Sequence, residues 1–463
     1  MRSDLSRTNR YTGTRRLRRM ASISVESLEE RAMLSHIPGS FGGPGSRPTM
    51  SPSAMTSTPV NAVNSARNLV GARALHRLHQ PAGLVTNGLH TLRVSSNSAQ
   101  RPVRPHALSQ QTVPAHLGPN GYRQTNLVSD FPVGVEGVNA QIQDPNLLNP
   151  WGLVSSATSP FWTSDQVTGV ATLYSVSQTG TAQKIPLTVT VPSQVTQPEH
   201  GFNPLTGPTG IVSNTTSDFQ IPSSTGTVPS LFIFATLDGT IVGWNPGSTA
   251  GMTNAVVMAN EGPAEEFTGL AMASSGGQNF LYTADPRLLP GINVFDSHFN
   301  KVTLAGNFTD PRLPAGFAPY NIQNINGHLF VTYLTTASGG GVVAEFNPDG
   351  TFVRQITANG TGGPLQAPWG ITLAPANFGR FSNALLVGNF GDGRISAFNP
   401  TTGRFLGQLR DPSGNFIVIP YLWSLKFGNG ASAGATNSLF FTAGVAGQFH
   451  GLFGSLQATG PLR

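Results

Sequence analysis

Cysteine is missing from this chain, and charged residues are scarce. None of its 463 residues is Cys, and only 10% are Asp, Glu, Lys or Arg. The missing thiols exclude disulfides, thiolate metal sites and a Cys nucleophile. The sequence also has no apolar run of about 18 residues or more, no phosphate-binding Gly loop and no nucleotide fingerprint. We therefore expect no transmembrane segment, and nothing in the sequence indicates a nucleotide-dependent enzyme.

Glycine and proline are abundant, and the charge is unevenly divided. The 54 Gly and 36 Pro, together with no sustained helical periodicity, predict an all-β domain with many turns. The net charge of +6 conceals a split, because the first 120 residues carry 15 Arg and four acidic residues while residues 121–463 carry a net charge of −5. The basic character belongs to the N-terminal region, so the predicted domain shows no sign of a nucleic-acid partner.

Residues 1–35 are predicted to be an export or targeting element. Acidic residues such as Glu26 and Glu29 interrupt the apolar stretch that a conventional signal peptide requires. The segment VESLEERAMLS resembles the LEPR-xLL element at the N-terminus of large exported proteins of planctomycete-type bacteria, although Glu30 stands where that element has Pro. The resemblance implies export to the cell envelope or beyond, and a short amphipathic helix within a disordered leader is the alternative.

Residues 36–119 are predicted to be a disordered, low-complexity linker. They are rich in Ser, Pro, Gly, Ala and Arg and lack any pattern that would bury one face of a helix or strand. The folded domain is therefore expected over residues 120–463.

One pattern occurs six times in residues 120–463, with separations of 58, 59, 52, 49 and 54 residues. Each copy has four short runs of alternating or β-branched residues, separated by turn residues. The period and the four runs predict a six-bladed β-propeller of four-stranded blades. The anchor positions in the first strand of each unit are Gly152, Gly210, Gly269, Asn321, Gly370 and Ser424. An aromatic residue also recurs in the third strand, at Tyr174, Trp244, Phe295, Phe346, Phe398 and Phe453.

The sixth unit lacks its outer strand. The segment from Gln124 to Asp130 resembles the fourth strands of other units, such as the one that begins at Phe352. We therefore predict that this N-terminal segment pairs with the strand around Phe453 and closes the ring, which removes exposed strand edges.

Residues 122–458 resemble an uncharacterised bacterial family of six-bladed propellers, distantly similar to NHL-repeat proteins. The shared features are TNLVSD at Thr125, NPWGL at Asn149 and GNFGDGRISAFNPTTG at Gly388. The resemblance implies the fold and no reaction.

Carboxylates are expected at the end of the channel where the blade connections and the turns between second and third strands emerge. Glu199, Glu265, Glu266 and Asp285 are the candidate ligands for a Ca²⁺ ion, which takes six to eight oxygens. Such an ion would support a lactonase-like, metal-dependent hydrolase. The alternative is turn chemistry, in which Asp bonds its own backbone.

Aromatic residues are expected at the same end, where the first strands begin. Trp151, Tyr320, Trp369 and Trp423, with Asn389, are the candidate ligand-binding residues, because rings with polar neighbours stack on sugars or peptides. The alternative is that the rings only pack between blades. The sequence therefore favours an exported, monomeric binding or interaction module whose partner is a protein, peptide or carbohydrate. A Ca²⁺-dependent hydrolase is the alternative, and no catalytic residue is assigned.

Overall fold

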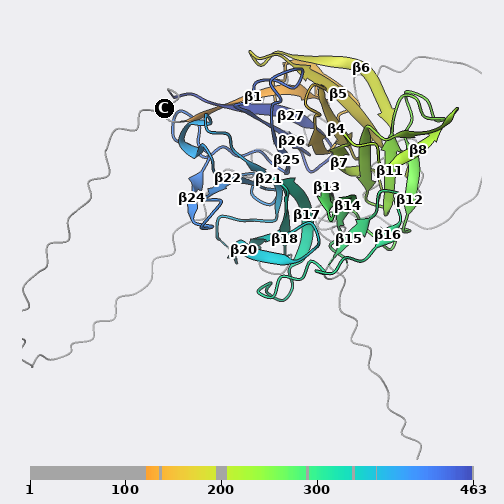
Figure 1. Cartoon of the computed structure of the whole chain (residues 1–463). Helices are drawn as coiled ribbons and strands as arrows, with labels where there is room; N and C mark the ends of the chain where they lie inside the picture. Colours follow the sequence, from red (N-terminus) through yellow and green to blue (C-terminus); the bar gives the residue numbers. More distant parts are fainter. Residues whose placement is uncertain are drawn as a thin grey trace, which may run out of the picture.

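The computed structural model shows six β-sheets around a central axis, which make a six-bladed β-propeller (Figure 1). It describes residues 121–460 apart from 135–137, 194–205, 288–290, 336–338 and 361. The predicted all-β, six-bladed fold is confirmed. The predicted export element and linker, residues 1–35 and 36–119, lie outside the described residues. In the part of the chain that is described, no helix has the length and apolar content needed to cross a membrane.

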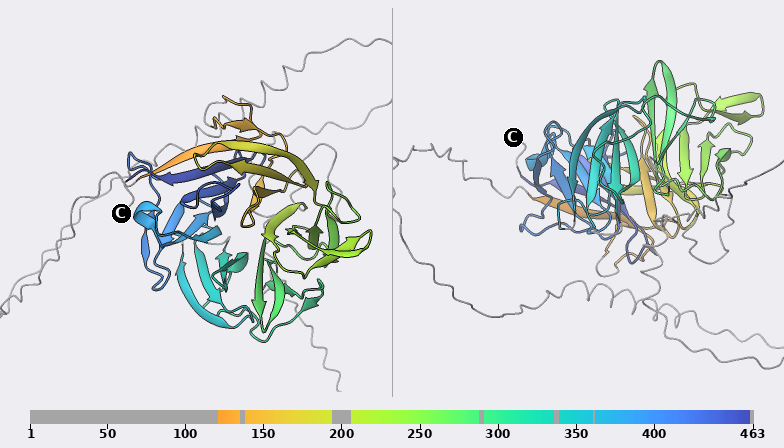
Figure 2. Two further views of the ribbon diagram at one scale, coloured as in Figure 1. Left: turned by 45° about the horizontal axis from the view of Figure 1, so that its top comes forward. Right: turned by 90° about the horizontal axis from the view of Figure 1, so that it is seen from below.

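Each blade begins with its strand nearest the axis and continues outward, and Figure 2 shows the sheets arranged around the centre. Blade one contains β3 (Pro150–Val154), β4 (Phe161–Asp165), β5 (Val170–Val176) and β6 (Ala182–Thr190). Blade two contains β7 (Pro208–Ser213), β10 (Phe232–Thr236), β11 (Thr240–Trp244) and β12 (Val256–Asn260). Blade three contains β13 (Gly269–Ser275), β14 (Gln278–Ala284), β15 (Ile292–Phe295) and β16 (Lys301–Val302).

The remaining blades follow the same order. Blade four contains β17 (Ala318–Ile325), β18 (His328–Leu334), β19 (Gly341–Phe346) and β20 (Phe352–Asn359). Blade five contains β21 (Pro368–Leu373), β22 (Leu385–Asn389), β23 (Ile395–Phe398) and β24 (Phe405–Gln408). Blade six contains β25 (Leu422–Phe427), β26 (Ser438–Ala443), β27 (Leu452–Ala458) and β1 (Tyr122–Ser129).

Three small elements go beyond the predicted four-stranded pattern. The strand β2 (Ile142–Gln143) pairs in parallel with β1, so the sixth sheet has five strands. A hairpin of β8 (Gln220–Ser223) and β9 (Gly226–Pro229) is inserted between the first two strands of blade two. A single turn of 3-10 helix, η2 (Gly379–Phe381), lies between β21 and β22.

The ring closes through the N-terminal strand, as predicted. The strand β1 is antiparallel to β27, and Val128 is paired with Phe453. A bulge at Leu127 places two consecutive side chains, Leu127 and Val128, in the core between blades six and one, where both are fully buried. The hydroxyl of Tyr122 extends the closure to blade five, because it donates to the Phe378 carbonyl at 3.0 Å.

The hydrophobic core is divided among the interfaces between neighbouring blades. The third-strand aromatic residues predicted from the repeat are all buried in these interfaces. In the inner strands, the residue after each anchor packs toward the preceding blade, as Leu153 does in the core between blades six and one. The next residue packs toward the following blade, as Val154 does in the core between blades one and two. This alternation follows from the two-residue period of a strand.

Glycine occupies four of the six anchor positions because the inner strands approach closely at this level. A Cβ on Gly210 would lie 2.3 Å from the Leu270 nitrogen of the next blade, and one on Gly152 would lie 2.4 Å from the Thr209 carbonyl oxygen. At Asn321 the side chain instead bridges two blades, with Nδ2 donating to the Trp369 carbonyl at 2.9 Å.

Candidate functional site

The predicted aromatic residues meet at the axis, where the inner strands begin. Trp151 and Trp423 are stacked with their ring centroids 3.6 Å apart, and Trp369 meets Trp151 edge-on at 6.1 Å. Tyr320 meets Trp423 at 6.0 Å. All four side chains are at most 3% exposed, so the rings cover one another and close the channel at this level. Their role in ligand binding stays a prediction.

Local backbone conformation directs the three indoles toward the axis. The residue two positions before each Trp has a left-handed φ: 45° at Asn149, 47° at Ala367 and 55° at Tyr421. The ladder to the second strand is also irregular at each of these tryptophans. Polar anchors then hold two of the rings, since Trp423 Nε1 donates to Asn149 Oδ1 and Trp369 Nε1 donates to the Thr268 carbonyl, both at 2.9 Å.

Asn389 lies beside this aromatic cluster, at the end of β22. Its Nδ2 donates to the Pro364 carbonyl at 2.9 Å, and its buried Oδ1 has no hydrogen-bond partner. The next residue, Phe390, has its ring centroid 4.4 Å from that of Trp423. The structure therefore places Asn389 with the predicted ligand-binding residues, and its contact with a ligand stays a prediction.

Three of the four predicted calcium ligands lie close together between blades two and three. Asp285 accepts hydrogen bonds from the backbone amides of Glu266 and Arg287, at 2.9 and 2.8 Å. Glu266 forms a 2.5 Å ion pair with Arg287, and Glu265 forms a 3.2 Å ion pair with Lys301. A cation would have to compete with these two basic side chains for the same oxygens. Glu199, the fourth predicted ligand, lies outside the described residues.

Burial of this cluster raises the pKa of Asp285 to about 7, with the neighbouring Glu265 carboxylate contributing. Across residues 121–460, in the parts that are described, no group of three or more His, Asp or Glu is arranged to hold a metal ion. Calcium binding by this set stays a prediction.

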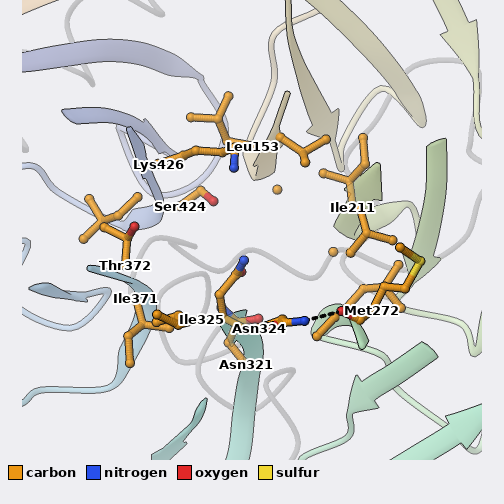
Figure 3. A pocket seen from close by; sticks show the side chains of 18 of the residues that line it. Leu153, Ile211, Met272, Asn321, Asn324, Ile325, Ile371, Thr372, Ser424 and Lys426 are labelled. Carbon is orange, nitrogen blue, oxygen red and sulfur yellow. Dashed lines mark hydrogen bonds between the residues drawn. The ribbon is translucent and has the colours of Figure 1, made fainter. Parts of the chain in front are cut away.

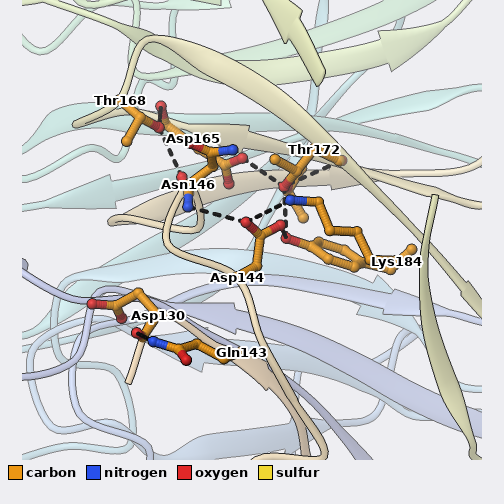
Figure 4. Close-up of polar contacts among 10 residues, drawn as sticks. Asp130, Gln143, Asp144, Asn146, Asp165, Thr168, Thr172 and Lys184 are labelled. Carbon is orange, nitrogen blue, oxygen red and sulfur yellow. Dashed lines mark hydrogen bonds and ion pairs between the residues drawn. The ribbon is translucent and has the colours of Figure 1, made fainter. Parts of the chain in front are cut away.

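A second buried carboxylate pair connects blades one and six (Figure 4). Asp144 accepts from Lys184 Nζ at 2.7 Å and from the Tyr174 hydroxyl at 2.7 Å. The Tyr174 hydroxyl lies 2.8 Å from Thr172 Oγ1, which lies 2.7 Å from Asp165 Oδ2. Both carboxyl groups are fully buried, so the network joins two acids through two hydroxyl groups.

The two acids of this network differ in their surroundings. Asp144 is paired with Lys184, whereas Asp165 has no basic partner among the described residues and accepts a hydrogen bond from Thr172 Oγ1. Burial raises the pKa of Asp165 well above its usual value, because desolvation disfavours the charged carboxylate. The network therefore contains one ion pair, between Asp144 and Lys184, and one buried acid whose neutral form is favoured.

A cavity of about 340 Å³ lies along the axis. It is on the side of the aromatic cluster toward which the inner strands run. Its walls come from the inner strands of all six blades, around and after their anchor positions (Figure 3). Figure 3 shows the Ser424 hydroxyl and the Lys426 side chain directed into it. This end of the channel is opposite the end where the sequence placed its candidate residues.

The sequence interpretation missed the cavity residues, although a signal for them was present. The positions two residues after the anchors are Val154, Val212, Ala271, Gln323, Thr372 and Lys426. All six line the cavity. Three consecutive units are apolar at this position and the next three are polar, a change that the hydrophobic periodicity of a buried strand does not explain.

Comparisons with known proteins find relatives in a virus. An uncharacterised protein of Acanthamoeba polyphaga mimivirus is 33% identical over 329 residues, which cover 68% of this chain and 76% of the viral protein. The chain belongs to the family of this mimivirus protein. A second uncharacterised family member from the same virus is 29% identical over 330 residues, which cover 68% of this chain and 81% of that protein.

No family model matches the chain. The bacterial family and the NHL-repeat likeness therefore stay predictions. Among solved structures, an α-L-arabinanase of Penicillium chrysogenum complexed with arabinobiose has a TM-score of 0.44 and 13% identity, over 74% of this chain and 100% of that one. A likeness this distant has no bearing on activity.

Proposed function

We propose that this propeller is a binding module that takes a small ligand into the axial cavity. The fold supports a binding or interaction role, and the cavity supplies a concave place with polar groups for a ligand. Among the described residues that line it, none is Asp, Glu or His, which are the side chains that most often act as general acids and bases. The lining instead supplies amide, hydroxyl and ammonium groups that can hydrogen-bond to a ligand.

One observation carries this proposal: several polar side chains lining the cavity have no hydrogen-bond partner among the described residues, and four of these lie on the inner strands of blades four to six. They are Gln323, Thr372, Ser424 and Lys426. Two other polar side chains of the lining, Asn321 and Asn324, are hydrogen-bonded to carbonyls of neighbouring blades. Groups that are partly desolvated and unpaired favour an occupant that completes their hydrogen bonds.

Filling the cavity tests the proposal. Thr372→Phe places a ring in the lining, and Thr357→Phe on the outer strand β20 is the matched control, because both threonines are half-buried. The full chain would be titrated calorimetrically with glucose, glucuronate, hexanoate and hexanamide. We expect at least one solute to bind the parent and the control with one site per chain and to lose at least tenfold in affinity in Thr372→Phe. If none of the four binds, or if the bound solute binds both variants equally, the cavity is not the ligand site.

We propose further that the module is exported or attached to the cell envelope. The support is the resemblance of the segment VESLEERAMLS, residues 25–35, to an exported-protein element. Fractionation of cells that carry the full chain, or the chain without residues 21–35, tests this directly. Export of the full chain and retention of the shortened one are expected. Equal retention of both in the cytoplasm would contradict the proposal.

A further inference from the structure

Lys426 differs from the other lysines of this protein. The chain has three lysines, and two of them are paired with carboxylates. Lys184 lies 2.7 Å from Asp144, and Lys301 lies 3.2 Å from both Glu261 and Glu265. Lys426 makes no ion pair or hydrogen bond through its side chain with any residue in the described ranges. A half-buried ammonium group without a counter-charge is unfavourable unless something else supplies one.

The cavity around Lys426 has two different halves. Blades four to six contribute its amide and ammonium groups and most of its hydroxyl groups, among them Gln323, Thr372 and Lys426, together with apolar side chains such as Ile371 and Leu425. Blades one to three contribute Gly and aliphatic or Met side chains with the single exception of Ser213. Figure 3 shows Lys426 and Ser424 on one side of the cavity and Ile211 and Met272 on the other. A ligand that fits both halves has a polar end and an apolar body.

We propose that the cavity binds a small organic anion, with its charged group at Lys426 and Ser424 and its apolar body against the inner strands of blades one to three. This inference rests on the proposed function, because it names the ligand class of the same site. The anion supplies the missing counter-charge, and the neighbouring hydroxyl groups donate to its remaining oxygens. The volume of about 340 Å³ limits the ligand to a small molecule.

The protonation of Lys426 is consistent with this arrangement. Burial lowers the pKa of Lys426, because desolvation disfavours its charged form. A bound anion would oppose this effect and raise the pKa again. Ligand binding and protonation of Lys426 are therefore expected to favour each other.

The first experiment compares ligands that differ only at the charged end. Hexanoate, hexyl phosphate, neutral hexanamide and cationic hexylamine would be titrated into the full chain, with acetate and inorganic phosphate as anions that lack the apolar body. We expect hexanoate or hexyl phosphate to bind at least tenfold more tightly than hexanamide and than the bare anions, and hexylamine not to bind. The stronger of the two anions distinguishes a carboxylate ligand from a phosphate ester.

Two lysine variants then test whether Lys426 binds the charged group of the ligand. Lys426→Met should lower the affinity for the preferred anion at least tenfold and leave that for hexanamide unchanged, whereas Lys301→Met, at the surface, should leave both unchanged. Equal binding of hexanamide and hexanoate, with loss of both in Thr372→Phe, would overturn the anion proposal and leave the cavity as a binding site. Binding unaffected by Thr372→Phe would overturn both proposals.

A measurement on the parent chain keeps the test independent of variant folding. Reductive methylation with ¹³C-formaldehyde labels the three lysines for NMR, and Lys426→Met assigns the signal. We expect the Lys426 signal to titrate below that of Lys301, whose pKa neighbouring carboxylates raise, and its midpoint to rise when hexanoate or hexyl phosphate is added. A midpoint that does not move under saturating anion would overturn the proposed contact.

Discussion

Truncation of Leu127 to Ala tests whether the N-terminal strand is part of the cooperative fold. Leu127 is fully buried at the bulge of β1, in the same core as Phe440 and Phe453 of blade six and Phe161 of blade one. The strand comes from more than 300 residues away in the sequence, since β1 pairs with β27. A defect at this position therefore acts on the closure of the whole ring.

The expected loss follows from the burial of Leu127. Replacing a fully buried Leu by Ala removes its transfer free energy and leaves a cavity, which together cost about 2–5 kcal/mol. We expect about 3 kcal/mol here. Arg123→Ala is the matched control, because Arg123 is exposed on the same strand, and its effect should stay within about 0.5 kcal/mol.

Urea unfolding followed by Trp fluorescence and circular dichroism measures both variants. Three of the five tryptophans lie in the axial cluster, so fluorescence reports on the centre of the ring. A single transition at lower urea is expected for Leu127→Ala. A loss below about 1 kcal/mol, indistinguishable from that of Arg123→Ala, would show that closure by β1 does not stabilise the ring.

Three further experiments test the polar groups and the inner strands. The folded-state pKa of Asp285 is raised from 3.8 to about 7, so the folded chain binds more protons than the unfolded chain between these values, and stability falls as pH rises through them. In urea titrations, the stability of Asp285→Asn relative to the parent should therefore increase from pH 4 to pH 8, by at most ~4 kcal/mol. A stability difference that stays constant over this pH range would contradict the raised pKa of Asp285. Asp165→Asn should change stability by less than about 1 kcal/mol, because burial raises the pKa of Asp165 and favours its neutral form, which Asn resembles. Asp144→Asn should cost about 3 kcal/mol, because it leaves Lys184 unpaired. Equal losses in thermal melts would refute this difference between the two acids. Gly210→Ala should cost about 1–3 kcal/mol, because its Cβ would lie 2.3 Å from the next inner strand. Gly360→Ala is the control and should be tolerated, because a Cβ there would meet nothing within 4 Å. Equal melting temperatures of these two variants would show that the inner strands can move apart to make room for the methyl group.

Much of the fold could be predicted from local patterns. Turn residues and two-residue alternation predicted where the strands lie. The anchor positions that recur from Gly152 to Ser424 predicted the number of blades. The similarity of the segment from Gln124 to other fourth strands also predicted the closure. The β8–β9 hairpin was missed because it lies inside one unit and has no counterpart in the others.

The site was predicted less well, because a pocket depends on which side chains meet across blades. The sequence placed Trp151 and Trp423 at the axis, and the structure shows that their rings are stacked on each other. It placed Glu266 among the calcium ligands, and the structure pairs this carboxylate with Arg287. Whether a polar side chain is exposed, paired or unpaired at the axis is set by neighbours that the local pattern does not specify.

The sequence by itself determined the six units, their strand order and the closing segment, because each depends on signals within one repeat of about 50 residues. Only the tertiary structure decided that the aromatic rings close one end of the channel and that Lys426 lies without a counter-charge at the other. The physical reason is that six inner strands from six separate repeats converge at the axis. Packing, pairing and hydration there are properties of the assembled ring.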